Sequence, residues 1–244
     1  MDVTATDFSA TVTGFWQRPF AGDTLVESAH MKVVVNPDLT FERRVTFLAR
    51  PGAPLQVTLT PAVADTLALD AMAALTEQAL RARLADRGIV MHEPDLLFNF
   101  TQRGADAVRA EPVGAHVRRL TAADQEMFTA FEAANSAADL DVAWVSLTDW
   151  AVFGAVVDGE LVCVSSAYPW GTGEVADIGI LTSLPARGQG HGVAVVRAIS
   201  APIYRAGLEP QYRTQPGNEG SRRTALRAGL ASFGIWETVT PEAS

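Results

Sequence analysis

The first half of the chain alternates short apolar runs with helical patterns. Apolar and polar residues alternate from Leu55 to Leu59, as expected of a half-buried strand. Pro61 then opens a helical pattern, and a second helix is predicted from Thr76 to Arg87, where Gly88 would end it. Further strands are predicted at Met31–Val35, Val45–Leu48 and Leu96–Phe100. This mixture predicts an α/β region.

The second half begins near Ala115 and has the same mixed character. A strand is predicted over His116–Leu120, and Thr121 caps a helix that continues to about Ala134. Asp158–Gly159, between two apolar runs, is the strongest β-hairpin signal in the chain. The elements predicted after it are strand Glu174–Thr182, helix Val193–Arg205, strand Gln211–Thr214, a helix from Asn218 to Gly229 and strand Phe233–Glu237.

The two halves are separated by a stretch that contains Pro and Gly, from Arg103 to Gly114. We interpret this stretch as a linker. It divides the chain into an N-terminal α/β domain, residues 1–112, and a second domain, residues 113–244.

The composition narrows the class of protein. An apolar fraction of 48% in 244 residues indicates a globular chain with a sizeable core. A net charge of −9 argues against nucleic acid as a partner, because phosphate binding needs a basic face, and it mildly favours cationic ligands. No apolar run approaches the roughly 20 residues of a membrane span, and the polar N-terminus does not resemble a signal peptide.

The cysteine and histidine residues add two expectations. Cys163 is the only cysteine and cannot form an internal disulfide, which indicates a reducing compartment. We therefore expect a cytoplasmic protein with no membrane association. The four histidines have no metal-ligand spacing, so no metal site is predicted.

The most informative segment is a glycine-rich turn, Arg187–Gly192, between a predicted strand and a predicted helix. Glycines let a ligand approach the backbone closely, and a helix N-terminus offers unpaired N–H groups, so the turn predicts a phosphate site. The dinucleotide spacing G-x-G-x-x-G fails, because the third position after Gly188 and Gly190 is Val193. The Gly-Lys pair of a P-loop is absent, since Lys32 is the only lysine.

The spacing that fits is R-x-x-G-x-G, from Arg187 through Gly190 and Gly192, followed about 30 residues later by a helix that begins at Asn218. With these motifs in this order, residues of about 115 to 240 resemble the GNAT superfamily of acetyl-CoA-dependent N-acetyltransferases. The resemblance implies a mixed α/β fold with a twisted mixed sheet flanked by helices, preceded here by a smaller α/β domain. Our hypothesis is that this smaller domain is a degenerate GNAT-like relative or a lid that shapes the acceptor site.

The resemblance also implies where acetyl-CoA would bind. In the family, main-chain N–H groups of the turn hold the pyrophosphate, and the strand before the turn pairs with the pantetheine arm. Asn218 would bind the cofactor through its amide with Ser221 beside it, and Asn218 is at the same time a natural helix N-cap. Carried onto this chain, the cofactor residues are Leu181, Thr182, Ser183, Arg187, Gly188, Gln189, Gly190, His191, Gly192, Asn218 and Ser221.

For catalysis, Asp177 is the first choice of general base and Glu174 the second, each with the alternative of a solvated carboxylate at a strand start. The tyrosine that family members often use as proton donor is replaced by Ala225. Tyr168 and Tyr212 are the possible substitutes, and each could instead be a half-buried strand residue.

The implied activity is transfer of an acetyl group from the CoA thioester to a primary amine by direct attack in a ternary complex. The partner would be a small-molecule or peptide amine. The replacement of the tyrosine by Ala225 leaves open a non-catalytic acyl-CoA-binding protein, a sensor or scaffold. The sequence leaves the acceptor open, and a homodimer is compatible with it.

Overall fold

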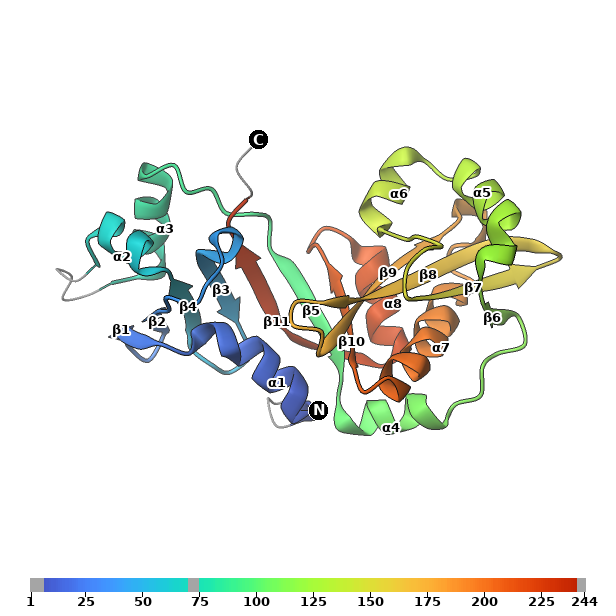
Figure 1. The fold of residues 1–244 in the computed structure, drawn as a ribbon, viewed down its shortest axis with the longest axis horizontal. Coiled ribbons are helices and arrows are strands. Elements are labelled where there is room, and N and C mark those ends of the chain that lie inside the picture. Colours follow the sequence, from blue (N-terminus) through green and yellow to red (C-terminus); the bar gives the residue numbers. More distant parts are fainter. Residues whose placement is uncertain (1–6, 70–74, 241–244) are drawn as a thin grey trace.

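The computed structural model describes residues 7–69 and 75–240, and these form two lobes joined by one continuous sheet (Figure 1). Eleven strands follow the order β1-β2-β4-β3-β11-β5-β10-β9-β8-β7-β6. The strands are β1 Asp23–Glu27, β2 Met31–Val35, β3 Val45–Ala49, β4 Leu55–Leu59, β5 Asp95–Phe100, β6 Val117–Arg119, β7 Ala151–Val157, β8 Glu160–Trp170, β9 Val175–Thr182, β10 Glu209–Thr214 and β11 Leu230–Thr238.

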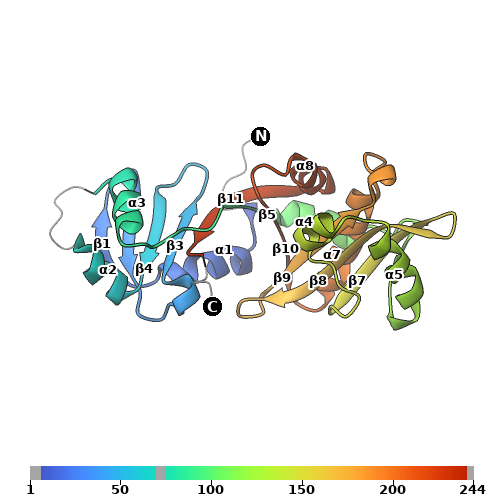
Figure 2. The ribbon, with the colours of Figure 1, turned by 90° about the horizontal axis from the view of Figure 1, so that it is seen from above.

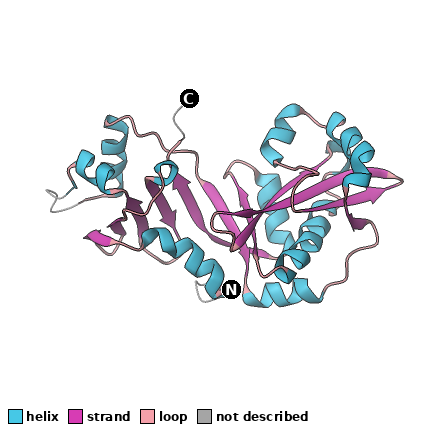
Figure 3. Cartoon of the chain, viewed as in Figure 1, coloured by secondary structure: helices cyan, strands magenta, loops and turns pink. Residues whose placement is uncertain are grey.

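The sheet is mixed, and helices lie along it in both lobes (Figure 3). Pairing among the described strands is parallel between β2 and β4 and between β9 and β10, and antiparallel elsewhere. The α-helices are α1 Ala10–Gln17, α2 Pro61–Leu67, α3 Glu77–Asp86, α4 Gln102–Ala110, α5 Gln125–Ala133, α6 Ala137–Ala143, α7 His191–Arg205 and α8 Glu219–Ala228. The predicted mixed α/β fold is confirmed.

The two halves of the chain interleave where the lobes meet. Strand β11, near the C-terminus, lies between β3 and β5, both from the first half. Strand β5 in turn pairs with β10, which belongs to the second half. Figure 2 shows β5 and β11 running from one lobe to the other. The division at residue 112 stays a prediction, and the sheet itself is continuous across it.

The stretch predicted as a linker is largely helical, so that prediction is wrong. Helix α4 covers Gln102–Ala110, and the Thr101 hydroxyl caps it by accepting a hydrogen bond from Gly104 N–H at 3.2 Å. Ala105 and Val108 are buried in the core of the second lobe. Burial of these two side chains stabilises a helix that the Pro and Gly content disguised.

Opposite faces of the second lobe's sheet carry different helices. Ile178 of β9 packs in the cluster that includes α7 and α8, and Leu181 packs in the cluster under α5 and α6. This is the alternation expected when both faces of a strand are covered. None of the helices in the described ranges is both long and apolar enough to cross a bilayer.

Helix α6 is pressed closely against β9, and a glycine makes this possible. A Cβ at Gly179 would lie 2.4 Å from the carbonyl oxygen of Ala143 and 2.8 Å from that of Trp144. Trp144 ends the helix in the left-handed region, with φ of 49°. The C-terminal end of α6 is therefore fixed above the second half of β9.

Candidate active site

The site begins where two parallel strands separate. Strands β9 and β10 pair from Val175 and Glu209 to Ile178 and Tyr212. β9 then continues to Thr182 without β10, while the end of β10 stays paired with β5. The edge of β9 after Ile178 is therefore open on the side that faced β10, and we call this edge the open edge.

Main-chain N–H groups point into the open edge at alternate residues. Ser183 N–H donates to the carbonyl oxygen of Val162, on the β8 side, at 3.0 Å. In an antiparallel ladder the direction alternates, so Leu181 N–H also points to β8, whereas Ile180 and Thr182 point away from it. The open edge thus presents the N–H groups of Ile180 and Thr182.

This geometry refines the predicted pantetheine residues. Among the three that the sequence indicated, Thr182 faces the open edge with its N–H. Leu181 is buried under α5 and α6, and the Ser183 hydroxyl accepts a hydrogen bond from Asn135 Nδ2 at 3.0 Å. Ile180 also faces the open edge with its N–H and was not among the predicted residues, although the period of two along a strand could have indicated it.

The glycine-rich turn lies directly beyond the open edge and is exposed from Arg187 to Gly190. Gly188 and Gly190 have φ of 80° and 90°, in the left-handed region that favours glycine. Gly190 precedes α7, and its carbonyl oxygen accepts the first helical hydrogen bond, from Ala194 N–H at 3.1 Å. The N–H groups of residues 191–193 therefore have no acceptor within the helix, which is the arrangement that binds anions.

Two side chains of the turn fold back and brace it. Arg187 donates to the carbonyl oxygen of Thr182 at 3.0 Å and forms an ion pair with Asp139 of α6 at 3.1 Å. Gln189 donates to the carbonyl oxygen of Pro185 at 3.1 Å. The surface of the turn that is left for a ligand is therefore mainly its backbone.

Gly192 is the second residue of α7, and its lack of a side chain allows close packing of the helix. A Cβ there would lie 3.2 Å from Thr224 of α8 and 3.4 Å from Ile180 of β9. A small residue lets α7 approach both neighbours and places the helix N-terminus beside the open edge.

The start of α8 forms the other side of the site. The Asn218 side chain caps α8 by accepting a hydrogen bond from Ser221 N–H at 3.0 Å, as one of the two predicted roles requires. The Ser221 hydroxyl lies 2.8 Å from the hydroxyl of Tyr212. Burial raises the pKa of Tyr212 to about 12, so this phenol is protonated at neutral pH. Ala225 of α8 is fully buried.

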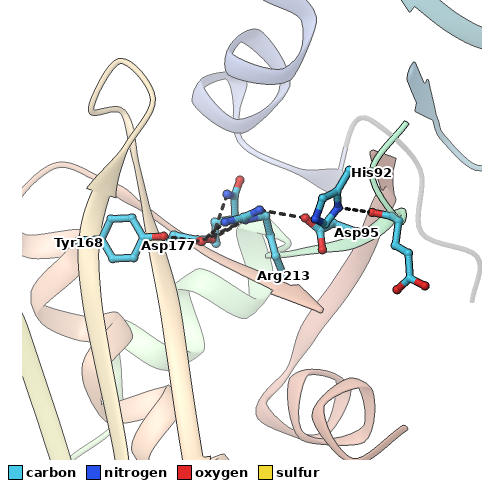
Figure 4. Close-up of polar contacts among 7 residues, drawn as sticks. His92, Asp95, Tyr168, Asp177 and Arg213 are labelled. Carbon is cyan, nitrogen blue, oxygen red and sulfur yellow. Dashed lines mark hydrogen bonds and ion pairs between the residues drawn. The ribbon is translucent and has the colours of Figure 1, made fainter. Parts of the chain in front are cut away.

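Asp177 is engaged in an ion-pair network (Figure 4). Its carboxylate accepts hydrogen bonds from Arg213 Nη2 at 2.6 Å, Gln211 Nε2 at 3.1 Å and the Tyr168 hydroxyl at 3.3 Å. Arg213 also binds Asp95 Oδ2 through Nη1 at 2.9 Å. The structure thus brings the predicted residues Asp177 and Tyr168 together, but around an arginine.

The charges of this network support one another electrostatically. Burial alone would lower the pKa of Arg213, but the carboxylates of Asp177 and Asp95 raise it above its ordinary value. Burial, and then the negative charge of Asp177, raise the pKa of Tyr168. Asp177 also precedes Thr182 by five extended residues, about 17 Å along the strand. Its geometry is that of a structural ion pair.

Glu174, the second predicted base, is half-buried and belongs to a different ion pair from Asp177. Its carboxylate pairs with Arg18 at 2.7 Å and accepts a hydrogen bond from the Thr172 hydroxyl at 2.9 Å. The hydrogen bond from Arg18 lowers the pKa of Glu174. A carboxylate with a lowered pKa and a cation already bound is a weak base.

An open pocket of about 780 Å³, which we call the cavity, lies on the surface beside the turn and the start of α8. Its volume is within the range of small-molecule sites. It is lined by Glu93, Pro94, Val142, Arg187, Gln215, Pro216, Gly217, Asn218, Glu219 and Gly220. Two of these, Glu93 and Pro94, come from the first half of the chain, and no local sequence signal could have linked them to the turn.

Comparison with known proteins gives matches among solved structures only. Neither a protein-family model nor a curated protein matches the chain. A GNAT-family acetyltransferase from Colwellia psychrerythraea is similar at 18% identity over 67% of this chain and 62% of the other, with a TM-score of 0.48. A GCN5-related N-acetyltransferase from Kribbella flavida is also 18% identical, over 67% of this chain and 64% of the other, with a TM-score of 0.48. This chain therefore spans less than two thirds of either acetyltransferase.

A third structure matches over almost the whole length. A functionally unknown conserved protein from Staphylococcus epidermidis is 11% identical over 97% of this chain and 98% of its own, with a TM-score of 0.46. Because identities and TM-scores are this low, we base the functional proposal on the open edge and the turn.

Proposed function

We propose that this chain is an acetyl-CoA-dependent N-acetyltransferase of the GNAT type. The observation that carries the proposal is the open edge of β9 immediately followed by an exposed glycine-rich turn at the N-terminus of α7. A tight turn alone would need no separation of β9 from β10. A broken strand pair and an anion site in succession fit a long ligand that has both amide groups and phosphates.

The residues present fit such a cofactor. The backbone N–H groups of the turn, from Gly188 to Gly192, would hold the diphosphate, where the helix dipole also favours negative charge. The N–H groups of Ile180 and Thr182 would bind the pantetheine arm and the thioester carbonyl oxygen. When bound, acetyl-CoA supplies the acetyl group as a reactive thioester. A backbone N–H aimed at the carbonyl oxygen stabilises the charge that develops there, by roughly 3 kcal/mol in other acyl transfers.

Proton transfer would depend on few groups of this chain. Asp177 and Glu174 are occupied by Arg213 and Arg18, so the amine would lose its proton to water or to a carboxylate of the cavity. Near the start of α8, one hydroxyl of the Tyr212–Ser221 pair donates to the other, and the remaining O–H would donate to the leaving thiolate in place of the missing tyrosine.

A binding protein without turnover is the second candidate. The same ion pairs favour it, because neither Asp177 nor Glu174 is a free base, and so does the burial of Ala225 at the usual tyrosine position. Such a protein would use the open edge and the turn to hold acyl-CoA as a sensor or scaffold.

Free thiol release distinguishes the two candidates. The protein is mixed with acetyl-CoA and a panel of primary amines, and the thiol is titrated with a chromogenic disulfide. We expect thiol release that requires protein, acetyl-CoA and amine together. Tight binding of CoA without release across the panel would select the binding protein, and the absence of any thermal shift with CoA would reject both.

A further inference from the structure

The charged side chains that line the cavity differ in whether they have an ion-pair partner. Arg187 is paired with Asp139 at 3.1 Å, and Glu219 is paired with Arg222 at 2.8 Å. Glu93 is exposed, and no cation in the described part of the chain forms an ion pair with it. The uncompensated charge of the cavity is therefore one carboxylate, and it belongs to the first half of the chain.

The backbone around Glu93 is held on both sides. Before it, His92 N–H donates to the carbonyl oxygen of Thr238 at 2.7 Å. After it, Asp95 starts β5 and is paired with Arg213 at 2.9 Å (Figure 4). The carbonyl oxygen of Glu93 itself contacts His92 Nδ1 at 2.8 Å. Glu93 thus has a fixed backbone position at the wall of the cavity.

Three apolar residues of the wall suit a hydrocarbon chain. Pro94, Val142 and Pro216 line it, and Val142 is 66% exposed although it is apolar. When an alkyl segment covers an apolar side chain that is exposed to water, the burial of apolar surface is favourable in free energy. A ligand that places methylenes there and a cation on Glu93 would satisfy both features.

We propose that Glu93 binds a second ammonium group of the acceptor, so that the acceptor is an aliphatic amine that carries another cationic group on its alkyl chain. This rests on the proposed function, since the first amine would react at the open edge. The proposal gives the first half of the chain a role in acceptor specificity and makes Glu93 a specificity-determining residue.

The test compares two probes of equal chain length, 1,4-diaminobutane and butylamine, by calorimetric titration of the whole chain with and without saturating CoA. The variants are Glu93→Gln and, as the matched control, Glu219→Gln, which also changes an exposed carboxylate of the cavity but one that Arg222 already holds. Both changes remove one negative charge and keep the side-chain shape.

We expect the unmodified chain to bind the diamine about tenfold more tightly than the monoamine, as a charged hydrogen bond allows. Glu93→Gln should abolish that preference, and Glu219→Gln should keep it. Equal binding of the two probes to the unmodified chain, or an equal loss in both variants, overturns the assignment of Glu93. Titration with CoA alone tests the proposed function separately. The absence of binding heat in that titration would mean that the proposed function itself fails.

Discussion

Replacement of His191 by Glu is expected to weaken CoA binding by about a hundredfold without loss of stability. His191 is the first residue of α7, beside the N–H groups that would hold the diphosphate. A carboxylate there repels phosphate at close range. The same carboxylate interacts favourably with the helix dipole, which adds about 0.3–1 kcal/mol to stability. Calorimetric titration with CoA and urea unfolding measure the two effects on the same sample.

The matched control is Ala10→Glu. Ala10 is exposed and is the first residue of α1, so this change adds the same charge at the same helical position away from the turn. CoA affinity should stay within twofold of that of the unmodified chain. A similar loss in both variants would show that net charge, and not the turn, governs binding.

Arg213→Met is expected to destabilise the protein by about 3–5 kcal/mol, the usual result of removing one partner from a buried ion pair. The Arg213 side chain is 22% exposed, and its partners Asp177 and Asp95 are 9% and 15% exposed. Without the guanidinium, two carboxylates stay in a poorly hydrated site where the lobes meet. Urea unfolding at neutral pH measures the loss.

The loss should shrink as the pH falls. Burial already raises the pKa of Asp95 in the folded chain, and removal of Arg213 would raise it further. A carboxyl group whose folded pKa is raised destabilises the fold above that pKa, and the penalty disappears below the unfolded value of about 4. The expected result is therefore a variant that approaches the unmodified chain between neutral pH and about pH 4.

Arg18→Met serves as the control for a surface pair. Arg18 and Glu174 also form a short ion pair, at 2.7 Å, but their side chains are 51% and 39% exposed. Exposed pairs contribute about 0–1 kcal/mol. A loss for Arg18→Met as large as that for Arg213→Met would contradict the structural role assigned to the buried network.

Local sequence patterns predicted a helix or strand well where its formation depends on nearby residues. The strand Leu55–Leu59 follows its own alternation, and α7 follows the glycine turn, because neither depends on distant residues. Helix α6 was missed, although Ser136 caps it by accepting a hydrogen bond from Asp139 N–H at 3.1 Å, a signal of helix start. The interleaving of β5 and β11 could not be predicted, because strand order depends on tertiary packing.

The same division applies to the site. The turn could be predicted, since two glycines before a helix and a third in its first turn form a local signal. Asp177 was predicted as a free base, but its carboxylate is bound by Arg213, which lies 36 residues away in the sequence on the neighbouring strand. The position of Ile180 depends on the direction of alternate N–H groups. That of Glu93 depends on the segment that leads into β5, the strand that crosses between the lobes. Pairing across strands and between halves is where a single sequence carries least information.

A crystal structure with CoA bound would test the central claim most directly. We predict the diphosphate on the N–H groups of Gly188 to Gly192, and the pantetheine arm along the open edge of β9 past Ile178, in contact with the N–H groups of Ile180 and Thr182. CoA bound elsewhere at saturating concentration, with the turn free of ligand, would contradict the account.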